Sequence, residues 1–222
     1  MNEFDTEPVP GLPEELPEGE QILWQGKPGA WGIARRVLLV PYVAIYFGVL
    51  TLWTLVGALN EGAGLAGALV SALWLVGLAA AAMAILGSLA WMIHRTTVYT
   101  ITNRRIVFRY GLALPMALNI PFNQVVAAAV NTQADQSGDL ALSISEDHAL
   151  AYIFMWPHAQ PWSFKRPKPM LRSIAGIATV STLLGRALAA TSASEVARRA
   201  IQPQTQAGRG WRRSLSDQPD IA

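Results

Sequence analysis

Histidine is the residue type with the clearest chemical potential in this chain, which contains three histidines and no cysteine. His94 ends a long apolar run, and Ala90 stands four residues before it. A neutral imidazole can ligate a metal ion such as magnesium, and a small residue one helical turn away would leave room for a macrocyclic pigment. His148 follows Glu146 and Asp147, a grouping that could exchange protons but is also typical of a solvated turn.

Motifs that would support catalysis are missing from the sequence. It contains no nucleophile elbow, phosphate-binding loop, HExxH zinc motif or dinucleotide-binding pattern in the required context. Disulfides and thiolate metal sites are excluded without cysteine. We therefore expect no enzymatic activity and no metal site. For His94, which is followed by Arg95, an ordinary histidine at a membrane boundary is the alternative to a pigment ligand.

The elements that position these residues begin with a segment that is almost free of charge. Residues 37–93 contain one charged side chain, Glu61, although 14% of the whole chain is charged. Two apolar runs, 37–59 and 65–93, are each long enough to cross a hydrocarbon core of about 30 Å. Polar and glycine-rich residues 60–64 separate them. We expect a transmembrane hairpin and exclude an ordinary soluble protein.

Basic residues flank this hairpin on both sides, and Lys and Arg favour the cytoplasmic side of a membrane. Both termini are therefore expected in the cytoplasm. No ionisable residue falls in the middle of either run, so transport or proton pumping is not expected. The basic residues that follow the hairpin are also expected to contact anionic lipid headgroups, the alternative being the solvent-facing side of a strand. They are Arg95, Arg104, Arg105 and Arg109.

Glycines recur within the two apolar runs, where small residues let membrane helices approach closely. Either the two helices of the hairpin pack against each other at these glycines, or one glycine face receives a helix of another protein. The glycines are Gly48, Gly57, Gly67, Gly77 and Gly87.

The pattern changes to β-branched and alternating residues after the hairpin. At least five short antiparallel strands are expected within residues 96–166. A helix is expected at about 169–190, with Ile174, Ile177 and Leu184 packed on the sheet; a third membrane span over the same region is the alternative. The expected fold class is an α+β membrane protein, with a two-helix transmembrane hairpin plus an antiparallel β-barrel and a C-terminal helix, the pleckstrin-homology-like (PH-like) arrangement.

Composition divides the chain into five parts. Residues 1–20 hold seven of the fifteen acidic residues and none of the seventeen basic ones, which predicts a flexible acidic arm. Residues 21–36 are expected to be a membrane-proximal lead-in, 37–93 the hairpin, 96–190 the PH-like cytoplasmic domain, and 191–222 a basic and largely flexible tail.

Residues 155–172 are the strongest candidate for binding a partner. Prolines reduce the cost of ordering a loop, and Trp and Arg are over-represented at interface hot spots. A hairpin loop folded onto its own tryptophans is the alternative. The residues expected to contact a partner are Trp156, His158, Trp162, Arg166 and Lys168.

Two sets of motifs carry a resemblance to known families. Residues 16–28 and 99–107 resemble segments of bacterial membrane-anchored PH-like proteins, which place a transmembrane hairpin before the second segment. The motifs Trp-Pro-His at 156–158 and Arg-Pro-Lys-Pro at 166–169 resemble the PuhB family, photosynthetic-complex assembly proteins of purple phototrophic bacteria. The likeness covers roughly residues 12–190.

The resemblance implies a non-enzymatic assembly factor for the photosynthetic reaction centre and core light-harvesting complex, located as a multi-pass protein in the bacterial inner (intracytoplasmic) membrane. Subunits of that complex and anionic membrane lipid would be its partners; a homodimer is also open, and nucleic acid is not expected. Two other functions stay open. One is a general PH-like protein for lipid contact or envelope maintenance, and the other is a resident subunit that binds bacteriochlorophyll through His94.

Overall fold

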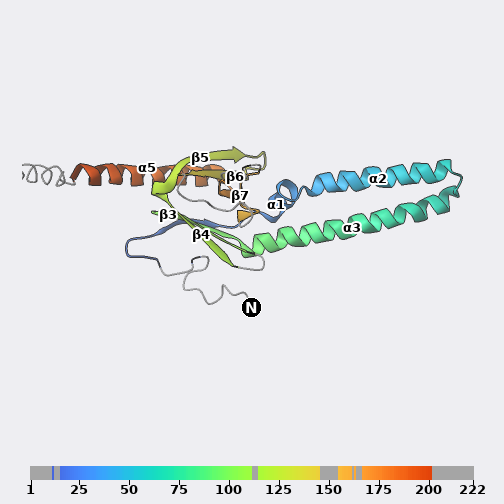
Figure 1. Cartoon of the computed structure of the whole chain (residues 1–222), viewed down its shortest axis with the longest axis horizontal. Helices are drawn as coiled ribbons and strands as arrows, with labels where there is room; N and C mark the ends of the chain where they lie inside the picture. The colour runs from blue at the N-terminus through green and yellow to red at the C-terminus, as the bar shows by residue number, and fades with distance from the viewer. Residues whose placement is uncertain are drawn as a thin grey trace, which may run out of the picture.

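The computed structural model describes residues 12, 16–111, 115–145, 155–161, 163 and 167–201. A long helical hairpin projects from one end of a β-rich domain, and a further helix extends from the other end (Figure 1). Chain order therefore alternates between the two parts: a strand and a short helix come first, then the hairpin, then the remaining strands and the last helix.

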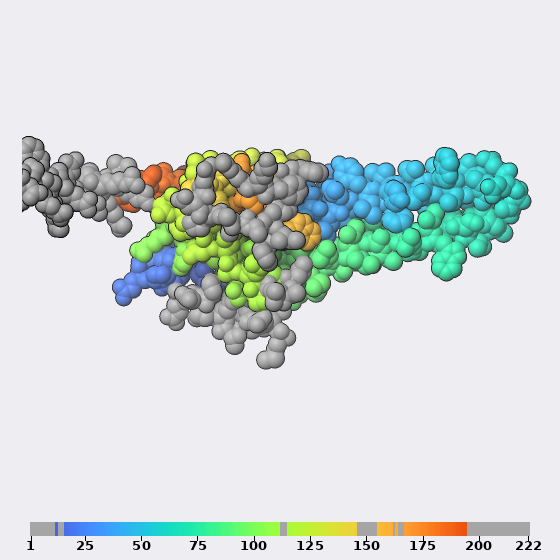
Figure 2. All heavy atoms as spheres, viewed as in Figure 1, coloured from blue at the N-terminus to red at the C-terminus, as the bar shows by residue number. Residues whose placement is uncertain are grey.

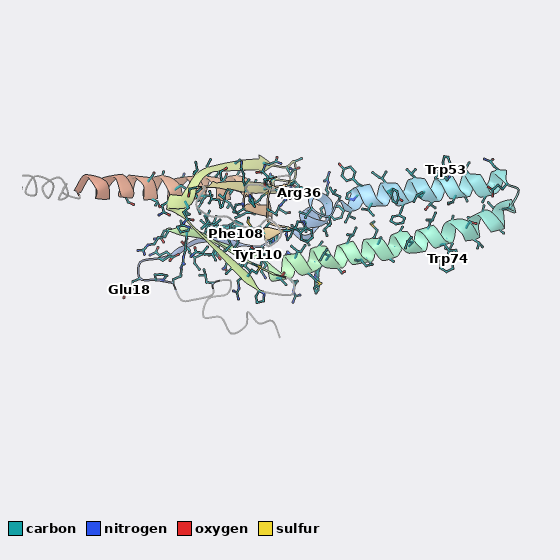
Figure 3. The ribbon with its side chains drawn as sticks, viewed as in Figure 1. Glu18, Arg36, Trp53, Trp74, Phe108 and Tyr110 are labelled. Carbon is teal, nitrogen blue, oxygen red and sulfur yellow. The ribbon has the colours of Figure 1, made fainter. Side chains whose placement is uncertain are left out.

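The hairpin consists of α2 (Val40–Asn60) and α3 (Gly64–Thr96). Among the described residues, these two helices are the ones long and apolar enough to cross a membrane. No residue of α2 is buried, so its apolar side chains lie on the outside of the projecting arm (Figure 2). Trp53 and Trp74 point outward from different sides of the hairpin (Figure 3). A large exposed apolar surface of this kind is typical of contact with a membrane or with another protein.

The first span begins three residues later than the sequence predicts. A separate helix, α1 (Ala30–Arg36), ends before it, and Leu39 adopts a left-handed conformation with φ of 54°. Pro41 then occupies the first turn of α2, where its missing N–H leaves no hydrogen bond unmade. The chain therefore changes direction at the base of the hairpin rather than continuing as one helix.

The first sheet has four antiparallel strands in the order β1-β2-β3-β4. They are β1 (Ile22–Gly26), β2 (Val98–Thr102), β3 (Arg105–Tyr110) and β4 (Met116–Pro121). The interpretation of residues 21–36 as a lead-in only is corrected here, because Gln25 pairs with Thr100. This segment contributes an edge strand to the sheet, and α1 in addition.

The second sheet has three antiparallel strands in the order β5-β6-β7. They are β5 (Val125–Thr132), β6 (Gly138–Ile144) and β7 (Met170–Ile174). A short 3-10 helix, η2 (Phe122–Gln124), connects the two sheets. The strands that the structure describes form two separate sheets, so the expected closed barrel is corrected to an open pair of sheets.

Helix α5 (Ile177–Ile201) packs on the sheets through Ile177, Val180 and Leu184, which are buried in one core with residues such as Phe108 and Leu140. The expected contacts of Ile177 and Leu184 are confirmed. The expected start of this helix near residue 169 is wrong, because residues 170–174 form β7 and Gly176 turns the chain with φ of 62°. Among the described helices, α5 does not qualify as a membrane span.

Helix α1 joins the hairpin to the second sheet. Ile33 and Ala34 are buried against Ala90 and Ile93 of α3, and the N–H of Gly29 donates to the carbonyl oxygen of Ser173 in β7 at 2.8 Å. Because the same short helix contacts both parts, the hairpin is attached to the domain through packed side chains as well as through the chain itself.

Candidate functional site

The described part of the 155–172 loop is fastened to the second sheet. The N–H of Met170 donates to the carbonyl oxygen of His158 at 2.7 Å, and the N–H of Gln160 donates to that of Lys168 at 2.9 Å. The guanidinium of Arg172 is buried and donates to the carbonyl oxygens of Pro157 and Ala159 at 3.2 and 2.7 Å. These contacts hold the backbone near Trp156 in one place.

His158 sits at the centre of a buried polar network. The Tyr99 hydroxyl accepts the N–H of Arg172 at 3.2 Å and lies 2.7 Å from Nδ1 of His158. Since that hydroxyl already accepts one hydrogen bond, its own proton is available for Nδ1. Nε2 of His158 then carries the ring proton and donates to the Thr97 hydroxyl at 3.2 Å. This arrangement fixes a neutral imidazole with both nitrogens satisfied.

Burial controls protonation in this network. Loss of solvation, together with the smaller effect of the neighbouring Arg172 charge, lowers the pKa of His158 to about 3. Burial also raises the pKa of Tyr99 well above its ordinary value. Both groups are therefore neutral at physiological pH, and the network acts as a fixed set of hydrogen bonds rather than as an acid–base pair.

The five predicted partner-binding residues do not have the same surroundings. Trp156 is 45% exposed and available at the surface, and Lys168 is half-buried. His158 is only 2% exposed, so in this structure it positions the loop and does not face a partner. Trp162 and Arg166 lie outside the described residues. Partner binding by the accessible members stays a prediction.

The four arginines that follow the hairpin are not one cluster. Arg95 lies at the end of α3 and stacks over the Trp91 ring at 5.1 Å. Arg109 pairs with Val98, which is the first residue of β2 and lies close to the end of α3. Arg104 and Arg105 lie at the opposite end of the β2–β3 hairpin, since β2 runs away from the membrane helices. Arg95 and Arg109 therefore lie beside the end of the helical hairpin and Arg104 and Arg105 do not; lipid contact by these residues stays a prediction.

Arg104 and Arg105 instead hold the segment that precedes β1. Nε of Arg105 forms an ion pair of 2.7 Å with Oε1 of Glu20, whose side chain is buried. The Arg104 guanidinium donates to the carbonyl oxygen of Glu18 at 3.3 Å. Glu18 lies at the end of the domain far from the hairpin (Figure 3). The two arginines therefore attach the last residues of the acidic arm, Glu18 and Glu20, to the sheet.

His94, the candidate pigment ligand, lies in the last turn of α3. Its Nδ1 donates to the carbonyl oxygen of Pro28 at 2.7 Å, because a carbonyl oxygen can only accept. The side chain thereby ties the helix end to the segment between β1 and α1. Pigment binding through its Nε2 stays a prediction.

The glycines of the spans do not bring α2 and α3 together. A Cβ atom at Gly48, Gly57, Gly77 or Gly87 would meet no atom within 4 Å. Close helix approach at these four glycines is therefore contradicted. Ala44, Phe47 and Gly48 on α2 and Ala79 and Ala80 on α3 line an open apolar groove of about 550 Å³. Reception of a foreign helix stays a prediction.

The base of the hairpin contains polar contacts that sequence reasoning missed. Arg36 donates to the Ser137 hydroxyl at 3.3 Å and lies 3.9 Å from the Asp139 carboxylate. That carboxylate also accepts the N–H of Ser173 at 2.7 Å. A single acidic residue inside an alternating apolar strand was the available signal for Asp139. Arg36 lies where the hairpin meets the domain (Figure 3).

Among the described residues, no three His, Cys, Asp or Glu side chains come together in a way that could hold a metal ion. A groove of about 810 Å³ lies between α5 and the first sheet. It is mainly apolar, and Leu23, Leu183 and Arg186 are among its lining residues. The features that could contact other molecules are therefore surfaces, grooves and strand edges.

Comparison with known proteins decides the family. The bacterial PH domain family matches residues 34–188. The chain belongs to this family. The chain is also 35% identical over 188 residues to an "uncharacterized 23.7 kDa protein in puhA 5′ region" of Rhodobacter capsulatus, covering 84% of this chain and 87% of that protein. This similarity is consistent with a PuhB-type protein, as the sequence motifs predict.

The family match gives the hairpin a defined place in this bacterial PH domain. The matched region begins inside α1 and continues through α2, α3, both sheets and part of α5. β1 lies before the matched residues although it is hydrogen-bonded to β2. No solved structure matches the chain.

Proposed function

We propose that this bacterial PH domain protein is a non-enzymatic integral membrane assembly factor for the photosynthetic reaction centre and its core light-harvesting complex. The observation that carries the proposal is the relative in the puhA 5′ region, a location that suggests an association with a photosynthesis locus. The resemblance of residues 156–158 and 166–169 to PuhB proteins supports the same function.

In this proposal α2 and α3 cross the inner membrane, and the β-rich domain and both termini lie in the cytoplasm. The distribution of charge supports the orientation: Glu61 stands alone in the turn between the helices, whereas Arg35, Arg36 and Arg95 lie at the other end of the hairpin. Anionic headgroups would then lie beside Arg95 and Arg109.

Two surfaces are suited to subunits that are being assembled. The groove between α2 and α3 offers small side chains at membrane depth, which suits a transmembrane helix. The anchored loop presents Trp156 in the cytoplasm, and the His158 network fixes its backbone, so little ordering entropy is lost when a partner binds.

The experiment introduces Trp156→Ala and Trp162→Ala together into the chromosomal gene of the source bacterium. We expect a several-fold loss of assembled complex, measured by membrane absorbance, while immunoblots show an unchanged amount of the variant protein. Trp31→Ala is the matched control, since Trp31 is an exposed tryptophan of α1. An unchanged amount of complex in the double variant, or an equal loss of complex in the Trp31→Ala control, would contradict a role of the loop in assembly.

Deletion of the gene tests the broader function. We expect the complex to be lost while its subunits are still synthesised, and tagged protein isolated during early complex build-up to carry subunits that are missing from the mature complex preparation. Co-purification with mature complex in fixed ratio would instead identify a resident subunit.

A further inference from the structure

The second sheet has one outer edge that is occupied and one that is open among the described strands. On the outer side of β7, the Met170 N–H donates to the carbonyl oxygen of His158, and the carbonyl oxygen of Ser173 accepts the N–H of Gly29. On the other side, β5 ends the strand order, and no described strand pairs with its outer edge. An unpaired strand edge is a template for another extended chain.

The register identifies the backbone groups that face this open edge. The N–H of Gln133 donates to the carbonyl oxygen of Ser137 at 2.8 Å and closes the β5–β6 hairpin. In an antiparallel ladder the bonded pairs alternate, so the odd-numbered residues of β5 from Asn131 back to Ala127 bond to β6. The residues whose N–H and C=O groups point outward are Ala128, Val130 and Thr132.

Two further contacts agree with this alternation. Leu142 lies opposite Ala128, and its N–H donates away from β5, to the carbonyl oxygen of Pro169 at 2.8 Å. In β4, the N–H of Phe122 donates to the carbonyl oxygen of Arg104. The next pair, Pro121 with Arg105, is therefore not hydrogen-bonded, and the backbone of Pro121 faces outward. A proline is tolerated at such a position because its backbone has no N–H to donate.

Side chains along β5 do nothing to protect its edge. Native edge strands are usually protected by charge, proline or a covering segment, and β4 carries Pro121. Residues 125–132 include no charged residue, proline or glycine, and Val126 is 72% exposed. This uncharged strand of eight residues, apolar from Val125 to Val130, therefore suits strand addition, in which the backbone provides the affinity.

The direction of β5 decides which kind of chain can bind. β5 points toward the hairpin (Figure 1), and the turn after it contains Ser137, which is hydrogen-bonded to Arg36 at the hairpin base. A second copy added antiparallel would be rotated by half a turn about an axis perpendicular to β5. Its hairpin would then point away from the membrane, so this self-pairing is excluded within one bilayer.

We propose that the outer edge of β5 binds, as an added β-strand, an extended uncharged segment of another membrane protein that directly adjoins the cytoplasmic end of one of its transmembrane helices. This partner fits because the membrane-proximal end of β5 lies where such a helix would emerge. The inference rests on the membrane orientation of the proposed function, and it does not require the partner to belong to a photosynthetic complex.

The test uses the full-length protein in its native membranes. The chain has no cysteine, so Val126→Cys introduces a single thiol beside the open edge, to which a maleimide–diazirine photocrosslinker is attached. Crosslinked sites are mapped by mass spectrometry. We expect them within about eight residues of the cytoplasmic end of a span in another protein, as follows from the length of β5.

Ala128→Pro removes an outward N–H and should lower the crosslinking yield at least tenfold. Ala117→Pro is the matched control, because Ala117 is an outward residue of the β4 edge by the same alternation, and it should leave the yield unchanged. If Ala128→Pro does not fold, Val130→Lys is the deciding variant, because it keeps every backbone hydrogen bond and places a charge beside the edge. It should also lower the crosslinking yield. A yield that neither variant lowers overturns the inference.

Other outcomes separate this inference from the proposed function. Crosslinks that only join two copies, or that only reach segments remote from a span, overturn the inference while the assembly function can stand. Edge-dependent crosslinks to membrane proteins outside the photosynthetic complex support the inference and contradict the assembly function.

Discussion

The hydroxyl of Tyr99 lies 2.7 Å from Nδ1 of His158 in the interior of the domain. The contact joins β2, which follows directly after α3, to the loop that carries the exposed Trp156. It therefore connects the strand that follows the helical hairpin to a candidate partner-binding surface, through one hydrogen bond that water cannot replace without opening the core.

Loss of this hydrogen bond should destabilise the protein. Tyr99→Phe leaves the buried Nδ1 of His158 without its donor, so we expect the free energy of unfolding to fall by about 1–3 kcal/mol. Denaturant unfolding of the full chain in detergent, followed by tryptophan fluorescence, measures it. Tyr42→Phe is the control, since Tyr42 is 68% exposed. Equal effects of the two substitutions would contradict the role of the network.

The same network predicts that stability depends on pH. His158 in the folded protein has a pKa of about 3, whereas an unfolded chain protonates histidine near pH 6.5. Between these values only the unfolded state binds the proton, so stability is full above about pH 6.5 and falls as the pH drops toward 3. The slope from this group is at most about 1.4 kcal/mol per pH unit.

Unfolding measured in steps between pH 7 and pH 4.5 tests this dependence. The variant His158→Asn cannot titrate, so the part of the slope that comes from His158 should be missing from it, although the variant is less stable overall. The same slope in both proteins would show that carboxylates alone cause the acid sensitivity.

The hairpin could be predicted from the sequence because a deficit of charge is a property of a continuous segment. Glu61 in the turn and the basic residues at the two ends gave its limits within a few residues. Residue types alone could not give the surroundings of His158. Its partners Thr97 and Tyr99 are about sixty residues away in the chain, so a loop that looks accessible in sequence has one buried member.

Nearness in sequence was also misleading for the arginines. Arg104 and Arg105 follow Arg95 closely, but the intervening β2 has five extended residues, which carry them about 17 Å farther from the hairpin. The pairing of β1 with β2 joins two strands that are separated in the chain by the whole helical hairpin. In addition, β1 has only five residues, too few for a local sequence pattern that would predict a strand.

Gly32 of α1 lies directly against Ser173 of β7. A Cβ atom at this position would collide with the Ser173 side chain, so Gly32→Ala should push α1 away from the second sheet. We expect the free energy of unfolding to fall by about 1–3 kcal/mol, measured as for Tyr99→Phe. Gly29→Ala, whose added Cβ would lie 3.0 Å from the Ser173 hydroxyl, should cost less.

A compensating substitution makes this prediction specific. Ser173 has φ of 50°, a conformation that glycine adopts readily, so Ser173→Gly removes the obstructing side chain without backbone strain. The double variant Gly32→Ala with Ser173→Gly should recover most of the lost stability. Additive losses in the double variant would show that the collision is not the cause.

The ion pair between Arg105 and Glu20 should stabilise the fold more than the neighbouring Arg104 does. The Glu20 side chain is only 2% exposed, so Arg105→Gln leaves a buried carboxylate without its partner, and we expect a loss of about 1–3 kcal/mol. Arg104→Gln, which loses only a hydrogen bond of 3.3 Å at the surface, should change stability by at most about 0.5 kcal/mol.

The double variant Glu20→Gln with Arg105→Gln separates the lost pair from the stranded charge. Because it removes the carboxylate charge as well, it should be more stable than Arg105→Gln alone. Thermal unfolding in detergent of the unsubstituted protein, the two single variants Glu20→Gln and Arg105→Gln, and the double variant completes the cycle. If Arg104→Gln proved as harmful as Arg105→Gln, attachment of the segment before β1 would depend on general positive charge at this end of the domain and not on the buried pair.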